Sequence, residues 1–154
     1  NQFSQTADQA TAERIAKDCL MLPPRSDSLD TLAKMADTAV AAGTNNGDWP
    51  YYAFVKGLAE YRQDHFAGAV EWLRKVAPTD AIPARTAEVY ATMAMAQFKL
   101  GRTEAARATL AQGLKVGKTY LAQPGRIDWN DQLIAQLLLR EARQVVTASA
   151  GSGQ

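Results

Sequence analysis

The sequence has little of what metal sites and redox sites require. It contains one cysteine, Cys19, and one histidine, His65, in 154 residues. A single cysteine cannot form an internal disulfide, and these two residues do not make a cluster of metal ligands. We therefore expect no metal and no cofactor. Cys19 is expected to be a small buried apolar residue, and His65 a solvated residue in a turn.

Excess charge and long apolar runs are also missing. The formal net charge is +1 at pH 7, whereas chains that bind nucleic acid usually concentrate basic residues on one surface. Arg140 and Glu141 interrupt the apolar run around residues 137–139, and no run approaches the roughly 18 apolar residues of a spanning helix. We expect no nucleic-acid partner and no membrane contact by this chain itself. The compartment stays open.

Motifs of catalysis are absent from the sequence. The glycines occur singly rather than in a phosphate-binding loop, and no serine stands in a nucleophile-elbow pattern. Two carboxylate pairs, Asp128 with Asp131 and Glu60 with Asp64, fall at helix ends and on polar faces. Helix capping and solvation explain both pairs. We expect no catalytic residue and no enzyme activity.

What the sequence does contain is helical periodicity. Between Tyr51 and Pro78, apolar residues recur at steps of three and four, as on the apolar face of an amphipathic helix. Capping signals, glycines and prolines divide the whole chain into further segments of this kind. In the first of them, Thr6 followed by Gln9 resembles a capping box, and in another, Gly117 is expected to end a helix. The pattern predicts seven helices. The second has several N-cap candidates between Ser26 and Asp30 and runs to about Ala42, and the others lie at about residues 7–21, 50–63, 66–76, 84–100, 103–116 and 128–147.

The helices form a repeat. Moving 37 positions along the chain takes Gly57 to Ala94 and Ala69 to Ala106, and it takes Arg62 to Lys99. A fixed spacing is typical of a helical repeat array, because one helix pair cannot bury its apolar face without a neighbouring pair. Gly57 and Ala69 match the small residues of the tetratricopeptide pattern, in which the two helices of a pair cross closely.

We therefore expect an all-α fold, a right-handed solenoid of the tetratricopeptide-repeat (TPR) type with three helix pairs and a C-terminal capping helix. Residues 1–147 would form a single domain with repeats at about 7–43, 50–78 and 84–117, and the capping helix at about 128–147. A polar face on the last helix would shield the end of the array. Residues 148–154 are expected to be a disordered tail.

Four segments carry a more specific resemblance. They are ERIAKDCLMLP (13–23), KGLAEYRQDHFAGAVEWLRK (56–75), AMAQFKLGRTEAARATLAQG (94–113) and DWNDQLIAQLLLREA (128–142). In this order they resemble the C-terminal tetratricopeptide region of planctomycete and verrucomicrobial serine/threonine protein kinases. The resemblance implies a protein-binding module, a fragment of a larger signalling kinase whose catalytic domain is absent here.

In such arrays the first helix of each pair lines a concave groove, where a partner segment binds. Cations beside aromatic rings can hold an acidic side chain or a terminal carboxylate. The residues expected in the groove are Arg14, Lys17, Tyr51, Phe54, Arg62, Glu88, Met95 and Lys99.

Two alternatives remain open at this stage. The cations of the groove can be solvated charges that only cover helix faces. The array can also be an oligomerisation module that associates with itself. Trp72 and Trp129 are expected to pack against neighbouring helices, and either one would mark an interface if it were exposed.

Overall fold

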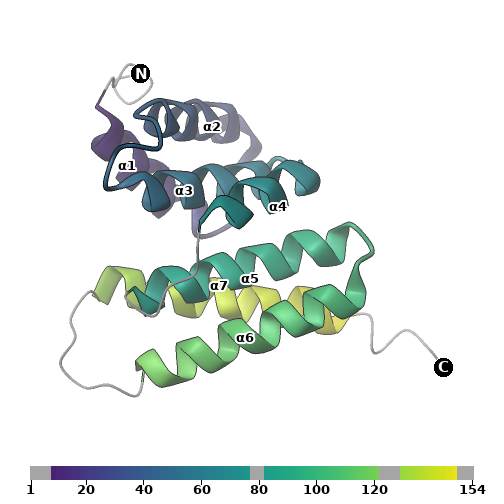
Figure 1. The fold of residues 1–154 in the computed structure, drawn as a ribbon. Helices are drawn as coiled ribbons and strands as arrows, with labels where there is room; N and C mark the ends of the chain where they lie inside the picture. Colours follow the sequence, from purple (N-terminus) through teal and green to yellow (C-terminus); the bar gives the residue numbers. More distant parts are fainter. Residues whose placement is uncertain (1–7, 77–81, 122–128, 149–154) are drawn as a thin grey trace. The chain divides into compact units, whose positions relative to one another are not determined.

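The computed structural model describes residues 8–76, 82–121 and 129–148. In these three stretches the chain forms helices and no strand, as Figure 1 shows. The helices are α1 (Gln9–Leu20), α2 (Ser26–Val40), α3 (Trp49–Arg62), α4 (Phe66–Lys75), α5 (Pro83–Lys99), α6 (Thr103–Leu121) and α7 (Trp129–Thr147). For the described residues, the prediction of an all-α fold with seven helices is confirmed.

The chain divides into two compact units, Asn1–Ala77 and Pro78–Gln154. The first unit holds α1 to α4, and the second holds α5 to α7. The single repeat domain over residues 1–147 stays a prediction. Of the predicted tail at 148–154, residues 149–154 lie outside the described residues.

In the first unit, α1 packs on α2 and α3 packs on α4, so that the predicted helix pairs are present. α3 also contacts both α1 and α2. The pair α3–α4 crosses at Gly57, where a Cβ atom would lie 2.7 Å from Leu73 Cγ and 3.5 Å from the carbonyl oxygen of Ala69. The predicted close crossing at Gly57 and Ala69 is therefore confirmed.

The beginning of α1 differs from the prediction. We expected a capping box formed by Thr6 and Gln9. Instead Asp8 is the N-cap, and its Oδ2 accepts a hydrogen bond of 2.8 Å from the backbone N–H of Thr11. Aspartate ranks above threonine as an N-cap, which agrees with a start at Asp8.

Cys19 is another correction, because it is exposed rather than buried. The buried apolar residues of α1 are Ala12, Ala16 and Leu20. These residues are four positions apart and lie along one side of the helix. Cys19 falls just outside this stripe.

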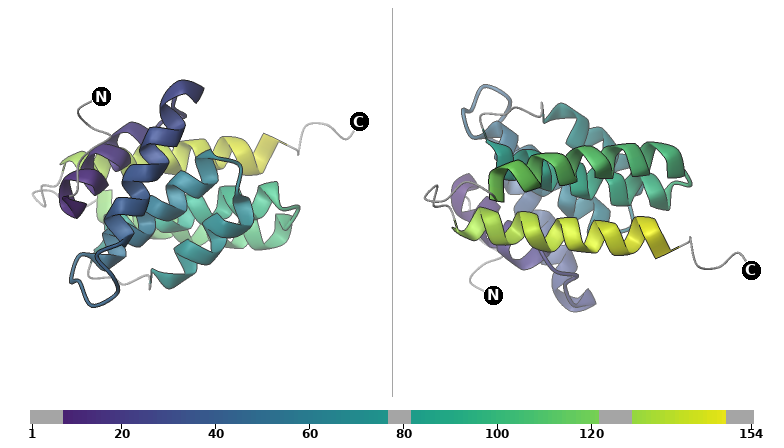
Figure 2. Two further views of the ribbon diagram at one scale, coloured as in Figure 1. Left: turned by 90° about the horizontal axis from the view of Figure 1, so that it is seen from above. Right: turned by 90° about the horizontal axis from the view of Figure 1, so that it is seen from below.

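In the second unit, α5 packs against α6 and α7, which also contact each other. The right-hand view of Figure 2 shows α6 and α7 side by side. The prediction that Gly117 ends a helix is wrong, because α6 continues through it to Leu121. A Cβ atom on Gly117 would lie 2.7 Å from Leu139 Cδ1, so this glycine admits the side chain of α7 instead of stopping the helix.

Candidate functional site

Two cations of the predicted groove lie on α1, and their surroundings differ. Arg14 is exposed. Lys17 is buried, and its Nζ lies 3.3 Å from Glu13 Oε1 and 5.8 Å from the centre of the Tyr51 ring. The side chains of this ion pair are only 9% and 7% exposed. Lys17 and the half-buried Tyr51 therefore contact each other across α1 and α3, while Arg14 remains accessible.

Arg62 has a structural role that the sequence did not suggest. Its Nε donates a hydrogen bond of 2.9 Å to the carbonyl oxygen of Leu20, and its Nη2 donates one of 3.1 Å to that of Met21. These carbonyls belong to the last residue of α1 and to its C-cap. Helix ends leave such carbonyls without helical partners, and a cation there also interacts favourably with the helix dipole. The guanidinium of Arg62 joins α3 to the C-terminus of α1.

The predicted groove therefore needs correction at three more positions. Phe54 and Met95 are fully buried, and Glu88 is 2% exposed. A large apolar side chain that is fully buried is a core residue, so Phe54 and Met95 are not accessible contact residues in this structure. Lys99, the last residue of α5, is exposed. Of the predicted residues, Arg14 and Lys99 offer cations at the surface.

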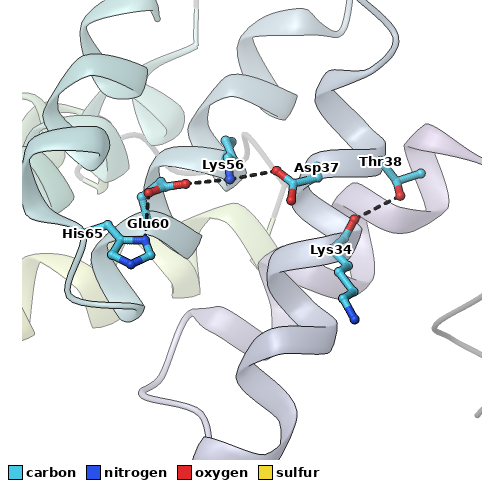
Figure 3. A network of polar contacts seen from close by, with 6 residues as sticks. All are labelled: Lys34, Asp37, Thr38, Lys56, Glu60 and His65. Atoms are coloured by element: carbon cyan, nitrogen blue, oxygen red, sulfur yellow. Dashed lines mark hydrogen bonds and ion pairs between the residues drawn. The ribbon is translucent and has the colours of Figure 1, made fainter.

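A polar network in the first unit links α2, α3 and the turn before α4 (Figure 3). Lys56 Nζ lies 2.7 Å from Asp37 Oδ1 and 2.6 Å from Glu60 Oε1, and Glu60 Oε2 lies 3.2 Å from His65 Nδ1. His65 is exposed in the turn, as predicted. A Cβ atom on Gly68 would lie 2.9 Å from Glu60 Oε2, so the glycine leaves room for this carboxylate.

The network keeps Lys56 charged. Burial alone would lower the pKa of Lys56, but hydrogen bonds and charge from Asp37 and Glu60 outweigh burial and raise it above the ordinary value of 10.5. The sequence indicated the pair Lys56 and Glu60 through its four-residue spacing, whereas Asp37 comes from another helix. The arrangement connects α2, α3 and the turn before α4.

The described residues provide no group of three or more His, Cys, Asp or Glu side chains that could hold a metal ion. Asp128, of the first predicted carboxylate pair, lies outside them. In the second pair, the carboxylate of Glu60 is engaged by Lys56 and His65. These contacts give Glu60 a structural role.

The sequence did not reveal a groove between α6 and α7. Its volume is about 560 Å³. The lining is formed by Leu114, Lys115, Gly117, Lys118, Gln136, Leu139, Arg140 and Arg143. The spacing of the four cations was visible in the sequence, but the packing that brings the two helices together was not.

The tryptophans also divide into two kinds. Trp72 packs against Trp49 with ring centres 5.9 Å apart, and Lys75 Nζ lies 3.8 Å from the centre of the Trp72 ring. This contact joins α3 and α4, as expected. Trp129, at the start of α7, is 69% exposed, and Leu133, one turn further on, is 39% exposed. The packing predicted for Trp129 is therefore wrong, and α7 presents a small apolar patch.

Comparison with known proteins found no match to this chain among family models, curated proteins or solved structures. Of the helices described, none is both long enough and apolar enough to span a membrane. Any functional conclusion therefore depends on the packing and the surfaces described above.

Proposed function

We propose that this chain is a non-enzymatic protein–protein interaction module built as a TPR-like helical array, and that it belongs to a larger signalling protein kinase. The observation that carries the proposal is the order of helix packing in each unit. α1 packs beside its partner α2 and beside α3, the first helix of the next pair. Likewise α5 packs beside α6 and beside the final helix α7.

This order of packing is what a stack of helix pairs requires. Each pair covers the apolar face of its neighbour, so the first helices follow one another along the array. Small residues support the same reading, since Gly57 permits the crossing of α3 and α4, and Ala94 and Ala106 are fully buried at the equivalent positions 37 residues on. A stack of this kind provides an extended surface suited to a peptide segment.

In this proposal the partner carries acidic groups, and one exposed cation in each unit attracts them, Arg14 in the first unit and Lys99 in the second. Arg62 is excluded from this role because its guanidinium is bound to the end of α1. Tyr51 is half-buried, and its ring lies beside Lys17. Its exposed part would add apolar contact with the partner.

A displayed library of random peptides tests this function directly. We expect the chain to select one acidic consensus, and Arg14→Glu/Lys99→Glu to weaken binding of the selected peptide about tenfold. The variant Lys34→Glu/Arg74→Glu is the matched control, because it changes net charge equally at two exposed positions on α2 and α4. Failure to select a consensus, or equal loss in both variants, would contradict the proposal.

Self-association is a second candidate, favoured by the exposure of Trp129 and Leu133 on α7. If these side chains form an interface between copies, sedimentation velocity will detect a dimer or larger species in the unmodified chain. Trp129→Ser/Leu133→Ser will then be a monomer. A monomer in both cases at high concentration excludes this candidate.

A further inference from the structure

We infer that the groove between α6 and α7 is a docking site for an acidic amphipathic helix of a partner protein. This inference goes beyond the proposed function, since it uses neither Arg14 nor Lys99 and neither of the helices α1 and α3. It depends on the charge of the groove, its apolar lining and its length.

The charge comes from both helices. Lys115 and Lys118 lie on α6, and Arg140 and Arg143 lie on α7. Each pair is spaced by three residues, which places its two members on one face of the helix. All four cations are exposed, and the part of the lining that the structure describes contains no carboxylate. A groove with cations on both sides and no anion attracts an acidic ligand.

The remaining lining is mainly apolar. Leu114 of α6 and Leu139 of α7 line the groove together with Gly117. The absence of a side chain on Gly117 brings Leu139 against the backbone of α6. Leucine side chains at this place favour a ligand that has apolar residues as well as acidic ones. A nucleic-acid backbone would use the four cations but not the leucines, and no aromatic residue lines the described groove to stack on a base.

The length of the groove suits a short helix. A second hollow of about 250 Å³ continues along the same two helices and shares Leu114 with the first. It is also lined by Arg107, whose Nη1 lies 2.9 Å from Glu104 Oε1. From Lys118 to Arg107, α6 advances about 16 Å at 1.5 Å per residue, which is about three helical turns. A partner helix of three turns would lie along this whole length with leucines inward and carboxylates at both edges.

A second copy of this chain fits the groove less well. The exposed acidic helix in the described part of the chain is α2, but two of its carboxylates already have partners. Asp27 pairs with Arg25 at 3.0 Å, and Asp37 pairs with Lys56 at 2.7 Å. The groove is therefore assigned to a helix from a different protein.

The test uses the full chain and a labelled synthetic peptide of three helical turns, with leucines on one face and glutamates on both flanks. Fluorescence anisotropy measures its binding. A peptide with lysines in place of the glutamates is the control ligand. We expect the acidic peptide to bind and the basic peptide not to bind. Affinity for the acidic peptide should fall as salt is raised, because exposed charges are screened.

Variants locate the binding site. We expect Arg140→Glu/Arg143→Glu to weaken binding of the acidic peptide about tenfold, and the neutral variant Arg140→Gln/Arg143→Gln to weaken it less. Lys34→Glu/Arg74→Glu changes the net charge equally in the other unit and should bind as the unmodified chain does. Circular dichroism confirms that each variant is folded.

Three results would overturn the inference. In the first, the acidic peptide binds no better than the basic peptide. In the second, the charge reversal at Arg140 and Arg143 leaves the affinity for the acidic peptide unchanged. In the third, a short DNA duplex or anionic lipid vesicles bind more tightly than the acidic peptide and depend on the same two arginines. Arg14→Glu/Lys99→Glu should retain full peptide binding, so this test and that of the proposed function can fail separately.

Discussion

At the scale of single residues, the cations of this chain do three different things that the sequence does not distinguish. Arg62 donates to the carbonyls that end α1, Lys56 holds two carboxylates on α2 and α3, and Arg14 is exposed. All three are basic residues on amphipathic helices. Their roles differ because of what the neighbouring helix places opposite each of them.

Replacement of Arg62 tests its structural role. Arg62→Gln removes the charged donors, and Leu20 and Met21 then lose their hydrogen-bond partner at the end of α1. We expect a loss of about 2 kcal/mol in the free energy of unfolding, because a hydrogen bond to a charged group contributes about 1.5–3 kcal/mol. Urea denaturation measures this loss, with the exposed Arg74→Gln as control. Equal stability of the two variants would show that the contacts of Arg62 contribute nothing.

The raised pKa of Lys56 predicts a dependence of stability on pH. Since the folded state holds the proton more tightly than the unfolded chain does, this contribution is complete below pH 10.5 and is lost as pH rises through the higher pKa of the folded state. We expect the unmodified chain to lose more stability than Lys56→Met above pH 10.5. Chemical denaturation at pH 8 and pH 11 measures the free energy of unfolding of both proteins. The contributions of the other titrating groups are common to both proteins and cancel in the difference. Parallel curves for the two proteins would rule the effect out.

At the scale of elements, the glycines inside helices are packing residues. Gly57 in α3 and Gly117 in α6 both lie where a Cβ atom would meet a leucine of the neighbouring helix at 2.7 Å. The contacts differ in kind. At Gly57 the added atom meets Leu73 Cγ and Cδ2, whereas at Gly117 it meets only the terminal Cδ1 of Leu139. A terminal methyl group can turn aside, but a branch point moves only with the whole side chain.

This difference predicts a larger loss of stability at Gly57 than at Gly117 for the same substitution. Gly57→Ala should destabilise the chain by about 2 kcal/mol, since overpacking costs about 1–3 kcal/mol. Gly117→Ala should be nearly neutral, because the gain in helix propensity of about 1 kcal/mol offsets a smaller clash. Thermal and urea denaturation of the two variants measure these changes in stability. A Gly57→Ala protein more stable than the unmodified chain would refute the close crossing of α3 and α4.

At the scale of the whole molecule, a core substitution in one compact unit can lower the stability of that unit alone or of both units. Leu73 packs against Gly57 within the first unit, and Leu139 packs against Gly117 within the second. In a repeat array, stability is approximately a sum of local terms and nearest-neighbour terms. Local openings can then have different free energies in different units.

Amide hydrogen exchange measures this directly. We expect Leu73→Ala to accelerate exchange in α1–α4 more than in α5–α7, and Leu139→Ala to have the reverse effect. Each leucine-to-alanine change in a core costs about 2–5 kcal/mol, which is large enough to resolve. Uniform acceleration over all helices by either variant would instead indicate one cooperative domain over residues 1–147.

The sequence by itself determined the helices, because helix formation depends on apolar spacing and on local stop signals. The starts at Phe66 and Thr103 were predicted at the right residue, and the paired helices followed from the repeat. The errors occurred at Asp8 and Gly117, where two local signals competed or where a helical glycine served a neighbouring helix.

Only the tertiary structure decided which side chains remain accessible and what they contact. A helix wheel did not separate Phe54, which is buried, from Arg14, which is exposed, on the expected concave face. Nor could it place Arg62 against the end of α1 or bring Lys115 and Arg140 into one groove. These relations join residues far apart in the chain, and they depend on how neighbouring helices cross. Local periodicity does not encode that geometry.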